Sequence, residues 1–276
     1  MASARNLSGV LELSNAQVSQ VSALVYRISG LNLHEGKFGL VRSRLSTRVR
    51  ASGFSDFESY LECLNSDSTG RELRLLVDAL TTNKTSFFRE PRHFEVLIGQ
   101  VLPELRPAHR PMRIWSAGCS SGEEPYTLAM VLLDQLGPKP NARILATDIS
   151  ARMLEVARKG VYTEEMVQDV PPHLRQLYFG RSANAPDYTV GEPVRALVRF
   201  AQLNLMAAWP MQRRFDLICC RNVMIYFDKP TQQRIVERFW DLLVPGGWFF
   251  VGHSESFAGL DHGFRYVEPA VYQKPA

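Results

Sequence analysis

The sequence predicts an α/β protein with a mostly parallel sheet, a small all-helical domain before it and a small insertion within it. Between residues 14 and about 80, apolar side chains recur at helical spacing. After Pro111, short runs rich in Val, Ile, Leu and Phe alternate with amphipathic segments, the order typical of a parallel sheet covered by helices. We therefore expect a helical domain over residues 1–80, an interdomain segment over 81–110 and an α/β domain over 111–276.

The composition is that of a globular protein long enough for one large core and a second, smaller one. The chain has 276 residues, 45% hydrophobic and 22% charged. It contains no apolar run near the roughly 18 residues of a membrane span, and its start lacks the pattern of a secretion signal, so we expect a cytoplasmic protein. The cysteines fit neither a paired CxxC metal site nor a disulfide framework, which predicts reduced thiols and no metal. They are Cys63, Cys119, Cys219 and Cys220.

The helical domain should contain three or four short helices. Ser14 and Ser55 stand where N-caps are expected, and Gly30 and Gly53 stand where helices are expected to stop. In the α/β domain we expect strands at 112–118, 142–150, 198–204, 215–220 and 246–252, with a further strand in 264–274. Helices are expected at 123–136, 151–158 and 231–243, and a small β insertion at about 162–197.

The first two strands of the α/β domain end in residues suited to a ligand. Gly118 and Gly122 lie in the turn after the first strand, where they either admit a close ligand or only let helix and strand pack closely. Asp148 ends the second strand, about 25 residues later, where a carboxylate can accept both hydroxyls of a ribose. The alternative is that Asp148 caps the next helix.

The fourth expected strand turns abruptly polar at its end, at Arg221 and Asn222. Polar residues at the carboxyl end of a buried strand face the ligand crevice. Asn222 can instead be a turn residue, and the nearby Tyr226 a core aromatic with its hydroxyl at the surface. The glycine turn, Asp148 and a late PGG turn at 245–247 together favour a nucleoside sulfonium over a dinucleotide.

Six segments in order along the chain resemble the successive motifs of the CheR family of chemotaxis receptor methyltransferases. They are TTNKTSFFRE (81–90), SAGCSSGEEPYTLA (116–129), ATDIS (146–150), NL (204–205), FDLICCRNVMIYF (215–227) and PGGWFFVGHSES (245–256). The family combines a small helical domain with a class I, Rossmann-like domain that uses S-adenosylmethionine (SAM). The resemblance implies methyl transfer from SAM to glutamate carboxylates of chemoreceptors, giving methyl esters and S-adenosylhomocysteine.

The resemblance also implies a set of site residues. It places Arg89 and Tyr226 beside the transferred methyl, and it leaves Glu123 and Glu124 as alternatives for one cofactor contact. The implied cofactor residues are Asn83, Thr85, Arg89, Glu123, Asp148, Asn204, Leu205, Arg221 and Asn222.

The implied partner is the helical methylation region of chemoreceptors, with no nucleic acid and no membrane insertion. The segment VRSRLSTRVR places Arg42, Arg44, Arg48 and Arg50 on one helix, either as a solvated face or as a docking surface for that acidic region. In some family members a β-subdomain at the position of the insertion binds a pentapeptide at the receptor C-terminus, and no motif here decides for or against such a tether.

The implied chemistry needs no general base, because a glutamate with a pKa of about 4.3 is already anionic at neutral pH. Placement of the carboxylate in line with the sulfonium methyl is what the enzyme must supply. An amino-directed nucleic-acid methyltransferase is disfavoured because its fourth strand would end in Asp/Asn-Pro-Pro-aromatic, and a dehydrogenase is disfavoured by the missing GxGxxG. A noncatalytic protein that binds SAM as a sensor remains the alternative.

Overall fold

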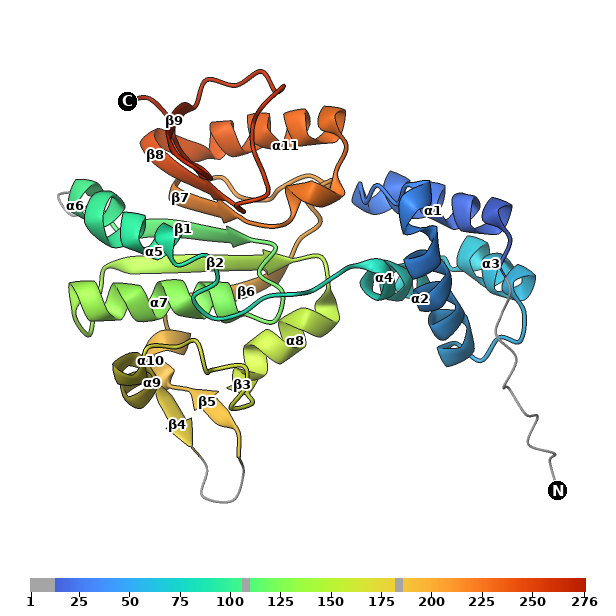
Figure 1. Ribbon diagram of the computed structural model, residues 1–276, viewed down its shortest axis with the longest axis horizontal. Helices are drawn as coiled ribbons and strands as arrows, with labels where there is room; N and C mark the ends of the chain where they lie inside the picture. Colours follow the sequence, from blue (N-terminus) through green and yellow to red (C-terminus); the bar gives the residue numbers. More distant parts are fainter. Residues whose placement is uncertain (1–12, 106–109, 182–185) are drawn as a thin grey trace. The chain divides into compact units, whose positions relative to one another are not determined.

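The computed structural model describes residues 13–105, 110–181 and 186–276, which form two compact units (Figure 1). The smaller unit runs to Thr82 and the larger is Asn83–Ala276. The described part of the segment that we expected between the domains, from residue 83 onward, therefore belongs to the larger unit; residues 106–109 of that segment lie outside the described residues. None of the described helices is both long and apolar enough to cross a membrane.

The smaller unit is a set of helices around a small apolar core. Ser14 caps the first helix, accepting a hydrogen bond from the Gln17 backbone, and Gly30 ends that helix in a left-handed conformation, as predicted. The prediction of Ser55 as an N-cap is wrong: Asp56, one residue later, accepts from the Ser59 backbone at 2.8 Å. The helices are α1 (Asn15–Ser29), α2 (Phe38–Ala51), α3 (Phe57–Ser66) and α4 (Arg71–Leu80), with a 3-10 turn η1 (Glu35–Lys37).

The larger unit is built on a seven-stranded sheet in the order β6-β2-β1-β7-β8-β10-β9. The first five strands in this order are parallel, and β10 and β9 are antiparallel additions at one edge. Along the chain, β1 is followed by β2 and β6 on one side of it, and then by β7 and β8 on its other side. The strand order therefore reverses at β1, where an open sheet forms its ligand crevice. The strands are β1 (Met112–Ala117), β2 (Ala142–Asp148), β6 (Val198–Gln202), β7 (Phe215–Cys220), β8 (Leu243–Val251), β9 (Arg265–Glu268) and β10 (Val271–Gln273).

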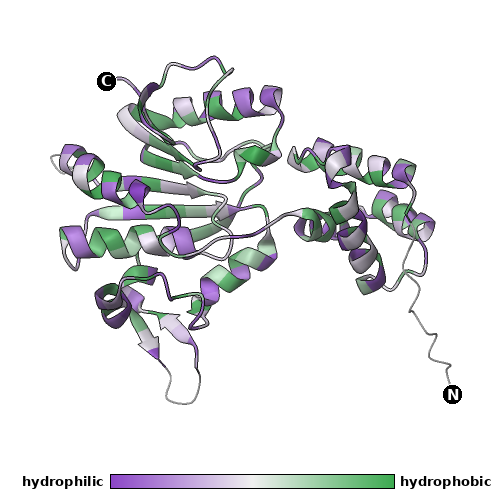
Figure 2. Ribbon diagram, in the orientation of Figure 1, coloured by the Kyte–Doolittle hydropathy of each residue, from purple (hydrophilic) through white to green (hydrophobic). Residues whose placement is uncertain are grey.

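Helices cover both faces of this sheet because neighbouring residues of its strands are buried on opposite sides. Ile114 belongs to the core on one face and Trp115 to the core on the other, and Phe250 and Phe249 divide in the same way. Figure 2 shows hydrophobic residues on the central strands and hydrophilic residues along α8 and α11. The helical segments are α5 (Arg92–Val96), the π-helix η2 (Leu97–Val101), α6 (Leu102–Leu105), α7 (Glu123–Leu136), α8 (Ala151–Lys159) and α11 (Lys229–Leu242).

The expected insertion is present as a second, three-stranded antiparallel sheet in the order β3-β5-β4. It comprises β3 (Val161–Tyr162), α9 (Pro172–Tyr178), β4 (Phe179–Arg181), β5 (Tyr188–Val190) and α10 (Glu192–Arg195). Residues 182–185 of the expected insertion lie outside the described residues. The predicted fold class is confirmed: a small helical domain, a mostly parallel sheet covered by helices, and a small inserted subdomain.

Candidate functional site

The candidate site lies where β1, β2 and β7 end, and two glycines shape the turn after β1. Gly118 has a φ of 89°, and a Cβ built on it would overlap the side chain of Val223. Gly122 has a φ of 99°, and its Cβ would lie 2.9 Å from the Cβ of Ala157. Both positions require glycine because of backbone conformation and neighbouring protein atoms. The close-packing interpretation of this turn is therefore supported by contacts in the structure itself.

Asp148, at the end of β2, ties that turn to the start of α8. One carboxylate oxygen accepts from the Ser120 backbone at 2.8 Å and the other from the Ser150 backbone at 2.9 Å. Asp148 is not the helix cap, because the Ser150 hydroxyl accepts from the Met153 backbone and caps α8 itself. Only 8% of Asp148 is exposed, so its carboxylate is a largely buried acceptor at the carboxyl edge of the sheet.

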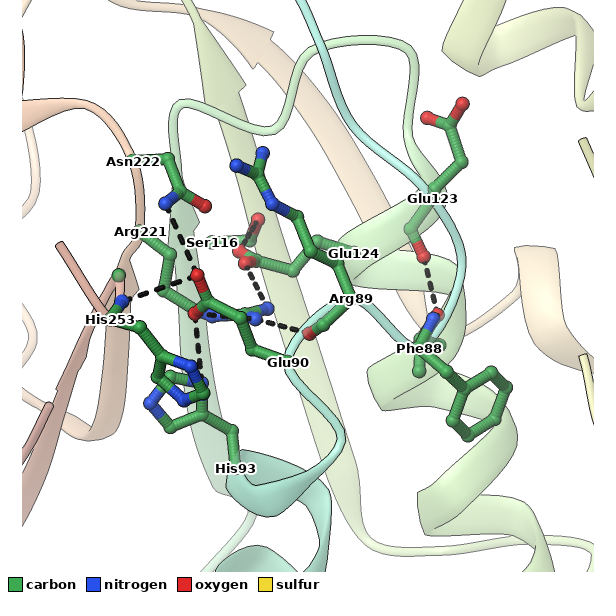
Figure 3. Close-up of polar contacts among 12 residues, drawn as sticks. Phe88, Arg89, Glu90, His93, Ser116, Glu123, Glu124, Arg221, Asn222 and His253 are labelled. Carbon is green, nitrogen blue, oxygen red and sulfur yellow. Dashed lines mark hydrogen bonds and ion pairs between the residues drawn. The ribbon is translucent and has the colours of Figure 1, made fainter. Parts of the chain in front are cut away.

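The neighbouring carboxylates Glu123 and Glu124, at the start of α7, have different partners. Glu123 is 1% exposed, and its carboxylate accepts from the Ser121 hydroxyl at 2.8 Å. Glu124 accepts from the Ser116 hydroxyl at 2.7 Å and from Arg221 at 3.0 Å. Burial raises the pKa of both carboxyls above the usual range, although Arg221 opposes this at Glu124. The two side chains separate in Figure 3, with Glu124 turned toward Arg221 and Glu123 turned away from it.

Arg221 lies at the centre of a buried ion-pair cluster (Figure 3). Its side chain is 3% exposed and contacts Glu124 at 3.0 Å and Glu90 at 3.1 Å. It also donates to the backbone carbonyl of Arg89. Burial alone would lower the pKa of Arg221, but the two carboxylates outweigh it, and the pKa lies above its ordinary value. The guanidinium is therefore a permanent cation, held by protein carboxylates and a backbone carbonyl.

Asn222 links the ends of β7 and β8. It has a φ of 60°, so the turn-residue interpretation describes its backbone correctly. Its amide donates to Glu90 at 3.2 Å, and its backbone N–H donates to Glu255 at 2.7 Å. Glu255 is 7% exposed and accepts two further backbone hydrogen bonds, from Gly252 and Ile225. The loop after β7 is thus fixed by carboxylates from two distant segments.

The remaining site residues of the larger unit are half-buried or lie next to the core. Arg89 is half-buried and donates to the carbonyl of Lys84 at 2.7 Å. The carbonyl of Asn83 accepts from the Ser120 hydroxyl at 3.1 Å, which places this segment beside the glycine turn. Tyr226 is also half-buried, at the end of the 3-10 turn η3 (Met224–Tyr226), and is not part of the core.

Three more of the expected cofactor residues fall at or near this edge. Thr85 is half-buried in the segment that carries Asn83 and Arg89. Asn204 follows β6 and accepts from the Met206 backbone at 2.9 Å, and Leu205 beside it is 8% exposed within the apolar core. The carboxyl ends of β6, β2, β1 and β7 therefore carry, or adjoin, every expected cofactor residue outside the segment 83–89.

Of the four arginines on α2, three contact other parts of the smaller unit. Arg48 is 18% exposed and pairs with Glu72, whose oxygen lies 2.7 Å from its Nε. Arg44 donates to the carbonyls of Leu80 and Thr81, and Arg42 donates to the carbonyl of Leu13. Arg50 is exposed. The interpretation of these arginines as a uniformly solvated face is therefore wrong, because Arg48 stabilises the contact between α2 and α4.

Comparison with known proteins identifies the family. Residues 16–81 match the model described as CheR methyltransferase, all-alpha domain, and residues 83–272 match the CheR methyltransferase, SAM binding domain. The chain belongs to the CheR methyltransferase family. The resemblance expected from the motifs is thereby confirmed.

Relatives in this family match over nearly their whole length. Chemotaxis protein methyltransferase 2 of Pseudomonas aeruginosa is 46% identical over 257 residues, which cover 92% of this chain and 91% of the relative. The chemotaxis protein methyltransferase of Escherichia coli is 41% identical over 266 residues, covering 95% and 92%. That of Borreliella burgdorferi is 38% identical over 273 residues, covering 96% of each chain.

The site of this CheR family member contains functional groups that the sequence analysis did not select, chiefly Glu90, Glu255 and Ser116. Glu90 and Glu255 lie inside two of the motifs that carry the resemblance, FFRE and GHSES. Their partners lie far away in the sequence: Glu90 contacts Arg221, 131 positions later, and Glu255 contacts Asn222, 33 positions earlier. Motif membership was the available signal, but it could not reveal what these carboxylates contact.

Glu90, His93 and His253 are the group of potential metal ligands found among the described residues, with ligand atoms within 4.8 Å of one another. His93 is 1% exposed, and burial lowers its pKa to about 4, so it is neutral at pH 7. The carboxylate of Glu90 already accepts from Arg221, from Asn222 and from the His253 backbone. Arg221 is the cation that Glu90 balances in this CheR family member, and we assign no metal to this group.

Proposed function

We propose that this protein transfers the methyl group of SAM to glutamate side chains of chemoreceptors, giving glutamate methyl esters and S-adenosylhomocysteine. The observation that carries the proposal is the match to the CheR SAM binding domain over residues 83–272 together with the polar groups gathered at the carboxyl edge of its sheet. The relatives named chemotaxis protein methyltransferase support chemoreceptors as the substrate class. We place the protein in the cytoplasm, as expected from the sequence.

The donors and acceptors at this edge fit SAM. In our proposal Asp148 accepts the ribose hydroxyls with the lone pairs left beside its two backbone contacts. Glu123 is the better candidate of the two neighbouring carboxylates, because Glu124 is engaged by Arg221. The proposal also assigns SAM contacts at this edge to Asn83, Thr85, Asn204, Leu205 and Asn222. Arg221 acts on the SAM site indirectly, through the backbone of Arg89 and through Glu124.

We propose that Arg89 and Tyr226 orient the substrate carboxylate. SAM supplies a methyl group on a sulfonium, and a carboxylate oxygen forms the new C–O bond as the S–CH₃ bond breaks, with no proton transferred. No base and no metal is required, because the substrate carboxylate is already anionic. Arg89 can pair with that carboxylate and Tyr226 can donate one hydrogen bond, and both contribute by placement, which can supply about 7 to 11 kcal/mol.

We propose that the smaller unit docks on the acidic, helical methylation region of the receptor. Arg50 is the exposed arginine of α2, and Arg42 is half-buried about two turns earlier on the same helix. Arg44 and Arg48 support this surface from within the unit rather than by direct contact. A receptor pentapeptide, as bound by some family members, would pair with an edge strand of the insertion, and β4 is such an edge in the order β3-β5-β4.

The experiment that tests the proposal is transfer of labelled methyl from SAM to membranes that contain candidate chemoreceptors. We expect label that mild base releases as methanol, because glutamate methyl esters are base-labile whereas methylated amines and amides are not. Membranes carrying the same receptor with its methylation-region glutamates replaced by alanine serve as the control. Base-stable label would show that the methyl group is on an amine or amide rather than on a glutamate carboxylate. Tight SAM binding without transfer to any receptor would favour the noncatalytic sensor instead.

A further inference from the structure

Arg89 is held between two residues in an unusual backbone conformation. Phe88 has a φ of 52° and Glu90 a φ of 57°, in the left-handed region that non-glycine residues rarely adopt. Such residues cost free energy and persist where surrounding contacts fix them. The contacts are present: the Phe88 backbone donates to the Thr127 hydroxyl at 3.2 Å, and the Arg89 carbonyl accepts from Arg221. The backbone at Arg89, from which its side chain extends, is therefore held in place by its neighbours.

Glu90 makes the largest number of these fixing contacts, and they come from two different strand ends. One carboxylate oxygen accepts from the Asn222 amide and from the His253 backbone, each at 3.2 Å. The other accepts from Arg221 at 3.1 Å. Figure 3 shows the Glu90 carboxylate among these three donors. Glu90 thus joins the segment of Arg89 to the loops after β7 and β8.

Glu90 needs its negative charge as well as its shape to hold the buried guanidinium of Arg221. Burial works to raise the pKa of Glu90, but the charge of Arg221 and the hydrogen bonds outweigh it, and the pKa lies below the usual value. Arg221 in turn is 3% exposed and depends on Glu90 and Glu124 for compensation. Because a glutamine keeps the size but not the charge, it would leave Arg221 with one carboxylate and weaken its hold on the Arg89 carbonyl.

We propose that Glu90 is a positioning residue for methyl transfer, which holds Arg221 against the backbone of Arg89 and so aims the Arg89 side chain at the substrate carboxylate. The inference rests on the proposed role of Arg89. It assigns to Glu90 no contact with SAM or substrate. Its action is through Arg89, which distinguishes it from a residue that only stabilises the fold.

A double-mutant cycle tests this on the full-length protein. Glu90→Gln, Arg89→Ala and the double variant are compared for turnover on receptor membranes, SAM affinity by calorimetry, and melting temperature. Misplacement of a reacting group by about 1 Å can cost about 100-fold, so we expect Glu90→Gln to lower turnover by about that factor. In the Arg89→Ala background the same substitution should change turnover by less than about 3-fold, because the side chain that Glu90 aims is gone.

Two further variants complete the design. Glu95→Gln removes the same charge from α5 nearby, where the side chain is 62% exposed, and should leave turnover unchanged. Glu90→Asp keeps the charge but shortens the side chain by one methylene and tolerates the φ of 57°, and it should give a smaller loss of turnover that also disappears with Arg89→Ala. It replaces Glu90→Gln in the cycle if that variant fails to fold.

The outcomes separate this inference from the proposed function. If Glu90→Gln lowers turnover by the same factor in the wild-type and Arg89→Ala backgrounds, Glu90 does not act through Arg89 and the proposal is wrong. Wild-type turnover in Glu90→Gln would also refute it. If Arg89→Ala alone keeps wild-type turnover, both the proposed role of Arg89 and the role of Glu90 are wrong, but the proposed methyl transfer is not contradicted. If the wild-type protein transfers no methyl group, the proposed function itself fails.

Discussion

Replacement of Arg221 by methionine should be among the most destabilising single changes in the larger unit. Methionine keeps a chain of similar length beside Phe94 but removes the charge and every hydrogen-bond donor. It leaves Glu90 and Glu124, each 13% exposed, without their shared cation. Removing one partner of a buried ion pair costs about 3–5 kcal/mol, a large part of the roughly 5–15 kcal/mol by which a typical domain is stable.

The loss should depend on pH in a direction that follows from the carboxylates. In the wild type the pKa of Glu124 is raised by burial despite Arg221, and that of Glu90 is lowered by Arg221 against burial. Without Arg221 both folded pKa values should lie above the unfolded value of about 4.3. Above about pH 4.3 the folded variant then binds more protons than its unfolded chain, so its free energy of unfolding falls as the pH rises toward the folded pKa values. The deficit relative to wild type should be smaller at about pH 5.5 than at about pH 7.5.

Urea unfolding followed by tryptophan fluorescence measures this loss. All 4 tryptophans of the chain lie between residues 115 and 248, so the signal reports the larger unit. Arg92→Met is the matched control: its side chain is 55% exposed and pairs with Glu268, and a surface pair of this kind contributes at most about 1 kcal/mol. A cost for Arg221→Met no larger than that of Arg92→Met, or a deficit that grows on acidification, would refute the assignment of a buried cluster.

Four further expectations follow from the same contacts. Asp148→Ala should weaken SAM binding by about 1.5–3 kcal/mol, the range for a hydrogen bond to a charged group, and unchanged affinity in calorimetry would exclude the ribose role. Tyr226→Phe should lower turnover at nearly constant SAM affinity, whereas equal losses of both would place the hydroxyl against the cofactor. Arg48→Gln should lower the thermal stability of the smaller unit, measured by circular dichroism, while Arg50→Gln should raise the Michaelis constant for receptor at low salt and leave stability unchanged; the reverse pattern would contradict the docking surface. Because burial lowers the pKa of His93 to about 4, this residue binds more protons in the unfolded chain than in the folded one between that value and about 6.5. His93 should therefore contribute stability that rises with pH there, by up to about 3 kcal/mol, and this contribution should be missing in His93→Gln.

The order of the elements could be read from the sequence because it depends on residues close together in the chain. Helical spacing and the hydrogen bonds of Ser14 involve positions within a few residues of one another. Local signals also limited the accuracy of boundaries: α11 begins at Lys229 rather than Thr231, because Asp228 accepts from the Thr231 backbone and caps the helix two residues earlier than predicted. The motifs indicated the family for the same reason, since each is a short run of letters in a fixed order.

What each charged residue contacts was decided by the tertiary structure. The sequence by itself determined that Arg221 ends a buried strand and that Arg48 shares a helix with other arginines. Only the fold brings Arg221 to Glu90 and Glu124, 131 and 97 positions away, and Arg48 to Glu72, 24 positions away. The physical reason is that a charge can be buried only with its partner, and that partner is supplied by whichever segment packs against it in three dimensions.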